Sequence, residues 1–449
     1  MRQSDLRLPM SVKAGYSLGD HAINIQLAAA SLFYLFFLTE VAGLRPSLAG
    51  LVLLVGRAVD AFTDPAMGRL SDATRWRAGR RRPYFLIGAL PFGITFALLW
   101  STYPFQSDVA LFAVYSIIYI ANTLSSTLLA VPYMALLPEM ALSYQDRTSA
   151  NTIRQVGVVA ALMLVAVAVR PAVEWFGGGA QGWWHLGLVM GVWIAVPWLV
   201  VHRVSFERPD FQPPAETSLV QGFRDLARHR AYLWLGGLYI ASRIALDIVG
   251  AVLIFWFTYW IARPGDFSPA LGLMLSTVVL AMPMWLWLSR SIDKRTLFVV
   301  GAGLWIAIQF GLFLLGPDDP RWLVFTLIGL AGIGYGVTDM MPWSMLGDVI
   351  DADEAHSGER RAGMYAGVFT FLRKLGGATG VAAAGFALEA AGFVPGAEQQ
   401  APALWTIRIL GTCVPIFFLV IASMCALRYP LTRVRHAELV NGLEETRSS

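Results

Sequence analysis

Charged residues are scarce in this chain: Asp, Glu, Lys and Arg make up 14% of its 449 residues, against about 25% in an ordinary soluble protein. Cysteine is nearly absent. The two that occur, Cys413 and Cys425, lie in one apolar segment and form no disulfide framework. With only six histidines, no nucleophile–base pairing and no metal-ligand spacing stands out. We therefore expect neither an enzyme nor a bound metal or organic cofactor.

Apolar residues, by contrast, make up 56% of the chain, and they gather into segments of the length that crosses a bilayer, about 20 residues. A lone apolar segment must satisfy its own backbone hydrogen bonds in lipid, so each is predicted to be a helix. The first holds Asp20 and Asn24 and lacks a small-residue cleavage site, so we expect a mature helix and not a signal peptide. The chain is predicted to be an all-α integral membrane protein with twelve transmembrane helices, at residues 14–38, 47–72, 83–102, 108–138, 149–169, 183–202, 231–261, 268–289, 296–316, 321–347, 363–391 and 402–427.

Lysine and arginine cluster in alternate connecting segments, including residues 75–82, 203–230, 290–295 and 433–435. All of these fall on one side if there are twelve spans, and the opposite connections carry few positive charges. The positive-inside rule then places both termini in the cytoplasm. A basic run such as 75–82 could also bind nucleic acid, but its place between two spans favours a topology signal, and we expect no nucleic-acid partner.

The longest polar interruption, residues 204–230, divides the spans six and six. It predicts an N-terminal half at 1–203, a cytoplasmic linker at 204–230, a C-terminal half at 231–428 and a cytoplasmic tail at 429–449. Two six-helix halves joined by a linker are the layout of the major facilitator fold. A phosphate-binding loop of the type G-x-x-x-x-G-K-[ST] is missing, which excludes an ATP-driven pump.

The second predicted span carries two carboxylates, Asp60 and Asp64, which are four residues apart and therefore share one helix face. A carboxylate at mid-bilayer costs about 3 kcal/mol and persists mainly where it works or pairs. Two like charges so close repel each other, and a bound cation, a shared proton or a neighbouring Arg would relieve this. We predict a cation site at Asp60 and Asp64 to which the hydroxyls of Thr63 and Thr127 contribute; the alternative is a structural cluster with Arg57.

Arg154 in the fifth predicted span is a further intramembrane charge, and the first predicted span carries Asp20. An Arg that faces a cavity could donate two hydrogen bonds to a carboxylate or to sugar hydroxyls. Pairing with Asp20 or with Asp60 is the alternative, and the sequence leaves both open.

The second half carries its own charges: the i,i+4 pair Arg243 and Asp247, then Asp339 with Trp343 one turn later, and Lys374. The pair is expected to neutralise itself and to be structural. An acid beside an indole suits sugar recognition, so Asp339 and Trp343 are predicted to bind substrate. Lys374 lies far from the start of its span, which favours a functional role over snorkelling to the interface.

Further charged residues in or beside the spans are predicted to form interhelical or gating ion pairs that hold one side of the protein shut. They are Arg57, Asp72, Arg80, Glu139, Arg147 and Asp348.

With these residues in view, the chain resembles the glycoside–pentoside–hexuronide:cation symporters, the group of the major facilitator superfamily that includes the melibiose permease. The likeness runs from about residue 13 to 430. It is carried by Gly15-Tyr16 with Gly19-Asp20, by residues 57–65 running into Gly68, Ser71-Asp72 and 79–83, by 131–136 with Asp146-Arg147 and Arg154, by 342–351, by Gly358-Glu-Arg360 and by 371–374.

The resemblance implies roles for individual residues. The positions of Asp60 and Asp64 bind the coupling cation in the sugar-transporting members, Thr127 matches a cation-site hydroxyl, Asp20 and Arg154 hold the sugar, and Lys374 lies near the cation site. Tyr16 belongs to the first-helix signature and is included among the predicted substrate-binding residues.

Two positions in the fourth span depart from the melibiose permease. Ala130 stands where that protein has an acid that serves both cation and sugar, and Met134 stands where it has a tryptophan. Animal relatives carry lysophospholipids. The cargo therefore does not follow from the family name, and Na⁺ and H⁺ both stay open.

These observations predict a secondary transporter of a bacterial cytoplasmic membrane that couples a cation, Na⁺ or H⁺, to symport of a sugar, glycoside or hexuronate by alternating access. A lysolipid transporter on the same scaffold is the alternative. A membrane sensor without transport is a third hypothesis, for which the short tail offers little room. The expected partners are a small solute, the coupling cation and membrane lipid, and we expect a monomer.

Overall fold

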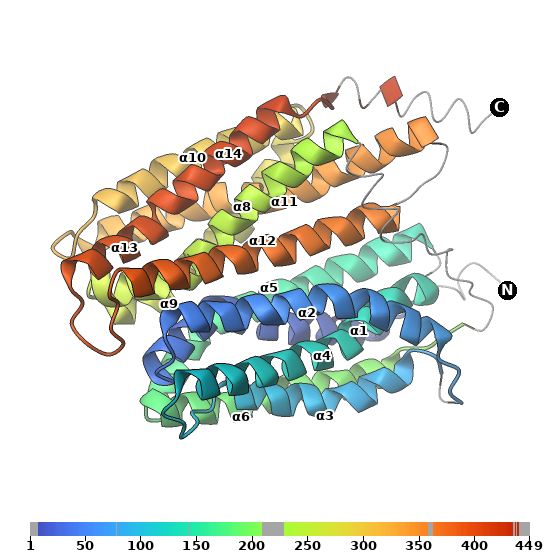
Figure 1. Cartoon of the computed structure of the whole chain (residues 1–449). Coiled ribbons are helices and arrows are strands. Elements are labelled where there is room, and N and C mark those ends of the chain that lie inside the picture. The colour runs from blue at the N-terminus through green and yellow to red at the C-terminus, as the bar shows by residue number, and fades with distance from the viewer. Residues whose placement is uncertain are drawn as a thin grey trace. The chain divides into compact units, whose positions relative to one another are not determined.

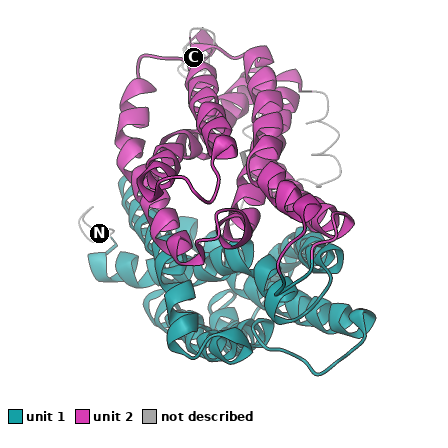
Figure 2. Ribbon diagram, turned by 90° about the vertical axis from the view of Figure 1, so that its left-hand side faces the viewer, with its two compact units in different colours: residues 1–213, 394–397 teal, residues 214–393, 398–449 magenta. Residues whose placement is uncertain are grey.

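The computed structural model describes residues 8–77, 79–141, 143–208, 229–357, 362–433, 436 and 438–439. Most of the predicted linker and the motif residues 358–360 lie outside this part of the chain. The chain divides into two compact units, one of residues 1–213 with 394–397 and one of residues 214–393 with 398–449 (Figure 2). We call them unit 1 and unit 2 and describe each by itself.

Long helices make up unit 1 (Figure 1), and its first helix continues into two π-helical turns. The elements are α1 (Met10–Ala29), η2 (Ala30–Tyr34), η3 (Phe37–Val41), α2 (Pro46–Ala73), α3 (Arg82–Leu99), α4 (Asp108–Met140), α5 (Tyr144–Trp175) and α6 (Gly179–Val204). Single-turn π segments of this kind often mark functional positions.

Unit 2 repeats the pattern, and its first helix also ends in a π-helical turn. Its elements are α8 (Arg230–Phe255), η4 (Trp256–Trp260), the 3₁₀ turn η5 (Pro264–Asp266), α9 (Phe267–Leu288), α10 (Lys294–Leu314), α11 (Arg321–Ser357), α12 (Ala362–Ala390), α13 (Ala401–Gly411) and α14 (Cys413–Arg428).

The all-α prediction is confirmed, since each predicted span coincides with helix in the described residues. Ten segments are long and apolar enough to cross a membrane, within the part of the chain that the structure describes. The two predicted spans outside this set are α1 and α12. Both carry polar residues of the predicted sites, such as Asp20 in α1 and Lys374 in α12, and these lower their hydropathy.

Two boundaries differ from the prediction. Helix α11, which corresponds to the tenth predicted span, runs to Ser357 rather than to residue 347. The last predicted span, 402–427, is broken at Thr412, whose backbone leaves the helical region (φ −129°, ψ −61°). The carbonyl of Gly411 at the break accepts a hydrogen bond from Gln309 Nε2 (3.2 Å). Pro415 has no N–H to donate to this carbonyl four residues earlier, and the side chain of Gln309 from α10 takes the place of the missing helical hydrogen bond.

One charged side chain of the last span, Arg408 of α13, is enclosed by aromatic rings. Its guanidinium carbon lies 4.5 Å from the ring centroid of Trp260, 4.2 Å from that of Phe313 and 4.8 Å from that of Trp405. Its Nε also donates a hydrogen bond to the carbonyl of Phe313 (2.6 Å). Cation–π contacts and this hydrogen bond offset the loss of water around the charge.

Candidate functional site

Three polar side chains of unit 1 meet between α2 and α4. The hydroxyl of Thr127 on α4 lies 3.1 Å from Oδ1 of Asp60 and 3.0 Å from Oδ1 of Asp64. Asp60 and Thr127 are buried, with 7% and 4% of their surface exposed. The i,i+4 spacing on α2 and the single residue on α4 thus bring together the three oxygens that the sequence predicts.

The geometry of this cluster carries a charge problem. A threonine hydroxyl has one proton and can donate to only one acceptor at a time. When the hydroxyl of Thr127 donates to one of the two carboxylates, the other carboxylate faces the Thr127 oxygen with no hydrogen between them. Two negatively charged groups then lie close together. A proton on one acid or a cation among the oxygens removes that repulsion. The cluster is chemically suited to hold one unit of positive charge.

Thr63 and Arg57, also predicted for this region, have different surroundings. The Thr63 hydroxyl donates to the backbone carbonyl of Asp60 within α2 (3.4 Å), and the structure does not show it at a carboxylate. Arg57 lies half-buried on α2, where it and Asp60 both act electrostatically on the hydroxyl of Tyr119.

A second polar cluster of unit 1 joins α1, α4 and α5. Arg154 donates from Nε to Oδ2 of Asp20 (2.5 Å) and from Nη2 to Oδ1 (3.1 Å). The hydroxyl of Tyr133 donates to Asp20 Oδ2 as well (2.6 Å). Of the alternatives that the sequence left open for Arg154, the structure shows the pairing with Asp20. Both carboxylate oxygens are used, so a solute that bonds to Asp20 or Arg154 must share or replace these contacts.

Tyr133 is the residue of this cluster that sequence reasoning missed. Its ring stacks on that of Tyr16 (centroids 4.3 Å apart) and lies under the Arg154 guanidinium (5.1 Å). Tyr16 donates its hydroxyl proton to the backbone carbonyl of Tyr133. A Cβ at Gly19 would come within 2.7 Å of the Tyr133 ring, so glycine is needed there for this close approach. Only the place of Tyr133 in the motif 131–136 could have marked it.

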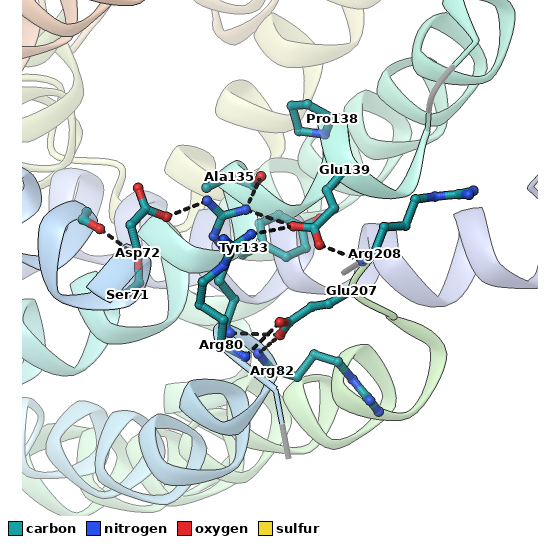
Figure 3. A network of polar contacts seen from close by, with 12 residues as sticks. Ser71, Asp72, Arg80, Arg82, Tyr133, Ala135, Pro138, Glu139, Glu207 and Arg208 are labelled. Atoms are coloured by element: carbon teal, nitrogen blue, oxygen red, sulfur yellow. Dashed lines mark hydrogen bonds and ion pairs between the residues drawn. The ribbon is translucent and has the colours of Figure 1, made fainter. Parts of the chain in front are cut away.

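Figure 3 shows a network of charges in unit 1 at the end of α4. Glu139 is fully buried and accepts hydrogen bonds from Arg80 Nη2 (3.2 Å) and Arg81 Nη1 (3.0 Å). Arg81 also bonds to Asp72 Oδ1 through Nη2 (2.5 Å). The predicted residues Asp72, Arg80 and Glu139 are therefore in one network. Its centre is Arg81, 2% exposed, which the sequence did not single out from its basic run.

Two residues that follow α6 complete this network. The carboxylate of Glu207 accepts three backbone N–H bonds, from Arg80 (2.7 Å), Arg81 (2.7 Å) and Arg82 (2.9 Å), at the start of α3. The backbone N–H of Arg208 donates to Glu139 Oε1 (2.6 Å). An acid at a helix N-terminus satisfies free N–H groups and complements the helix dipole. Gly79, with φ of +117°, leaves room for it, since a Cβ there would lie 2.8 Å from Glu207 Oε1.

We expect Glu207→Ala to lower the free energy of unfolding by about 2 kcal/mol, because it removes hydrogen bonds to a charged acceptor. Glu207→Gln should lose less, since it keeps an acceptor oxygen. Thermal unfolding of the purified protein measures both. The matched control is Glu174→Ala, which removes an acid that is 65% exposed on α5 and should change stability by well under 1 kcal/mol. Equal effects of Glu207→Ala and the control would contradict the capping role.

The predicted ion pair of Arg147 takes another form. Its Nε donates to the carbonyl of Ala141 (2.7 Å) and its Nη2 to that of Pro138 (3.4 Å), both at the end of α4. Free carbonyls at a helix C-terminus attract cations. The neighbouring Asp146 forms the interhelical ion pair instead, with Lys13 Nζ of α1 (2.8 Å).

In unit 2, Asp339 of α11 accepts a hydrogen bond from Nη1 of Arg243 on α8 (2.9 Å). Trp343, one turn after Asp339, packs edge-on against Tyr239 (centroids 5.9 Å apart) and Phe369 (5.1 Å). The predicted acid and indole thus lie on one helix beside an aromatic group. The sequence predicts that Arg243 and Asp247 neutralise each other. In the structure Arg243 also donates to Asp339.

The other predicted residues of unit 2 are Lys374 and Asp348. Lys374 is half-buried on α12. Asp348 is 8% exposed and accepts a hydrogen bond from Lys294 Nζ of α10 (2.6 Å), so the predicted ion pair of Asp348 is present within unit 2. His436 of the tail lies 3.1 Å from Oδ2 of Asp351 in the same region.

Sequence comparisons match the chain over residues 15–433 to the family described as MFS/sugar transport protein. It is 30% identical to the isoprimeverose transporter of Lactiplantibacillus pentosus, over 95% of this chain and 90% of that protein. It is also 30% identical to the inner membrane symporter YicJ of Escherichia coli (94% and 92% covered). Similarity extends to the sodium-dependent lysophosphatidylcholine symporter 1 of Gallus gallus, at 25% identity (99% and 91% covered).

Among solved structures, the fold is similar to that of the nucleoside transporter NupG, with a TM-score of 0.70 over 94% of this chain and 100% of that one. The identity of the two sequences is 13%, so this likeness concerns the fold alone.

Proposed function

From the premise that the chain belongs to the MFS/sugar transport protein family, we propose that it is a secondary active transporter that couples a cation, Na⁺ or H⁺, to symport of a sugar, glycoside or hexuronate. Membership of this family confirms the resemblance drawn from the motifs. It also confirms a multi-pass membrane transporter rather than an enzyme. The coupling ion, the cargo, the bacterial cytoplasmic membrane and the cytoplasmic placement of both termini are parts of the proposal.

The observation that carries the cation coupling is the contact of one Thr127 hydroxyl with both Asp60 and Asp64. A loaded cation neutralises the repulsion between the two acids. An empty site keeps an excess negative charge in a low-dielectric interior, where it is costly. Loading therefore changes the cost of moving the site through the protein, and this links the cation to the conformational change. Thr63 donates its proton to the Asp60 carbonyl and keeps the lone pairs of its hydroxyl oxygen, through which it is proposed to contribute.

The cargo is proposed to bind at two groups of residues. In unit 1, Asp20, Arg154 and Tyr16 offer a carboxylate, a guanidinium and an aromatic face. In unit 2, Asp339 and Trp343 offer an acid beside an indole, and Lys374 adds a positive charge on α12. Carboxylates accept hydroxyl protons, and aromatic faces cover the apolar faces of sugar rings. Both suit a polar ring with many hydroxyl groups.

The charged network at the start of α3 is proposed to hold one side of the transporter closed. Asp72, Arg80 and Glu139 belong to it directly, and Asp348 with Lys294 is the corresponding pair in unit 2. Arg57 is proposed to balance the charge of Asp60, and Arg147 to fix the end of α4 from which Glu139 projects.

A lysolipid cargo is the second candidate, and the observation that favours it is similarity over nearly the whole chain to a protein named a lysophosphatidylcholine symporter. Thermal unfolding of the purified protein across sugars, sugar acids and lysolipids, with and without Na⁺ and at two pH values, tests both candidates. A ligand at about 100 times its dissociation constant adds roughly 2.7 kcal/mol to the native state. Stabilisation by a sugar that needs Na⁺ or varies with pH supports sugar symport, and stabilisation by lysolipids alone replaces it with the second candidate.

A further inference from the structure

Asp247 and Asp339 of unit 2 share the guanidinium of Arg243, whereas Asp20 of unit 1 has Arg154 to itself. Arg243 donates from Nη2 to Oδ1 of Asp247 (2.5 Å) and from Nη1 to Oδ1 of Asp339 (2.9 Å). Its Nε–H is buried and has no hydrogen-bond partner. Arg154, by contrast, uses Nε and Nη2 on the single acid Asp20. The guanidinium of Arg243 is thus divided between two acids.

The other titratable and charged groups around this cluster do not supply a second close counter-charge. Tyr239 of α8 and Tyr335 of α11 face it with neutral hydroxyls, and Arg373 of α12 acts on those two tyrosines at longer range. Within the described residues, Asp247 and Asp339 have one guanidinium between them at hydrogen-bonding distance. With both acids ionised, one negative charge would lack a partner at hydrogen-bonding distance.

A second observation points to a ligand at the same place. Tyr239 lies one turn before Arg243 on the face of α8 that carries Asp247, and it is fully buried. Among the described residues its hydroxyl makes no hydrogen bond of full geometry. The indole of Trp343 approaches it only as a donor, so the hydroxyl proton has no acceptor there. A buried hydroxyl without a partner costs about 1 to 3 kcal/mol and calls for a group that is absent from the protein itself.

We infer that Asp247 and Asp339 together bind one exchangeable proton, with Arg243 as their shared counter-charge and Tyr239 as a hydrogen-bonding neighbour of the water that delivers it. The site is additional to the cation site proposed at Asp60 and Asp64. Either can fail without the other, and the inference does not depend on which solute is carried.

Asp247 and Asp339 differ in solvent exposure, and this difference indicates which of them receives the proton. The side chain of Asp339 is 47% exposed and that of Asp247 is 20% exposed. Asp247 Oδ2 lies against Gly377 of α12, where a Cβ would come within 1.7 Å of it. Asp339 is therefore the acid that solvent reaches and that receives the proton. Arg243 is then released from Asp339 and can give both Nε and Nη2 to Asp247.

Infrared difference spectroscopy of the purified protein in lipid nanodiscs, without cargo or Na⁺, tests the inference. Spectra at about pH 5 and about pH 9 are both taken above the pKa of an ordinary carboxyl group, which is about 4. A C=O stretch that titrates between them therefore reports a carboxyl group that keeps its proton to an unusually high pH. We expect the unaltered protein to show such a band from this site, beside any band that the Asp60 and Asp64 cluster gives. Asp339→Asn should remove it. Asp247→Asn should remove it as well, because Asp339 then has Arg243 to itself and stays ionised.

Asp60→Asn is the matched control from unit 1, and it should leave the band in place. Asp339→Glu keeps a carboxyl group and should shift the frequency of the band, which covers the case in which Asp339→Asn does not fold. A band that persists unchanged in both the Asp339 and Asp247 variants, or that only Asp60→Asn removes, would overturn the inference.

Discussion

Concentrative uptake should be lost when Asp60 is replaced by Asn, and replacement of Asp64 by Asn should have the same effect. Either change leaves one carboxylate at the Thr127 hydroxyl, which can then donate to it without a cation present. The repulsion that a cation relieves is gone, and so is the link between loading and movement. The measurement uses the solute that stabilises the protein in the thermal-unfolding test. Its accumulation in energised cells or vesicles is compared with its entry by equilibration alone.

Thr127→Ala tests the same cluster more gently. Loss of a hydrogen bond to a charged group costs about 1.5 to 3 kcal/mol, so we expect the apparent affinity for the coupling cation to fall about 10- to 100-fold. Thr127→Ser should keep most of it. Ser125→Ala is the matched control, because the Ser125 hydroxyl donates to the carbonyl of Ala121 within α4. Normal accumulation in the Asp60→Asn protein at normal expression would refute the cation site.

The second large effect is expected at the pair of Asp20 and Arg154. Arg154→Ala leaves Asp20, 6% exposed, with the Tyr133 hydroxyl but without its counter-charge. Removal of one partner of a buried ion pair typically costs 3 to 5 kcal/mol. We discount this to about 2 to 3 kcal/mol because 17% of the Arg154 side chain is exposed. Thermal unfolding should show this loss, and solute binding should be lost with it.

The double variant Asp20→Asn with Arg154→Gln separates stability from binding. It removes both charges together and should recover most of the lost stability, but not solute-dependent stabilisation. Thr152→Ala is the matched control on the same helix, since Thr152 is exposed and its hydroxyl donates to the carbonyl of Thr148 within α5. A double variant that binds the solute as well as the unaltered protein would make the pair purely structural.

The parts of the site that the sequence predicts are those that depend on local spacing. Asp60 and Asp64 share a face because they are four residues apart on a helix, and this holds whatever packs against them. The family motif adds Thr127 on another helix. Local spacing does not identify the partner of Arg154, because Asp20 and Asp60 lie on other helices and the sequence does not say which of them packs beside it. The close approach of Tyr133 to α1 at Gly19, with its hydroxyl donating to Asp20, accompanies the pairing of Arg154 with Asp20.

The residues that the sequence did not indicate act over long distances along the chain. Glu207 bonds to backbone N–H groups about 125 positions away, and backbone groups have no residue type that a pattern could detect. The break at Thr412 was also missed, because hydropathy averages over a whole span and does not register that Pro415 cannot donate to the carbonyl of Gly411. Gln309, which donates in its place, is on another helix. Arg147 was assigned to a carboxylate because charge predicts a counter-charge. In the structure, helix-end carbonyls fill that role.

The aromatic rings around Arg408 also bear on how the chain is made. Arg408 lies about two turns after the start of its span at Ala401. An arginine inside a span raises the cost of membrane insertion, by up to about 3 kcal/mol at the centre. Trp260 and Phe313, two of the three rings that enclose it, belong to segments that are synthesised before it. Two of the three rings that contact Arg408 have therefore already been synthesised when the ribosome reaches this residue. Cation–π contacts with these earlier segments can then offset part of the free-energy cost of inserting Arg408 into the bilayer.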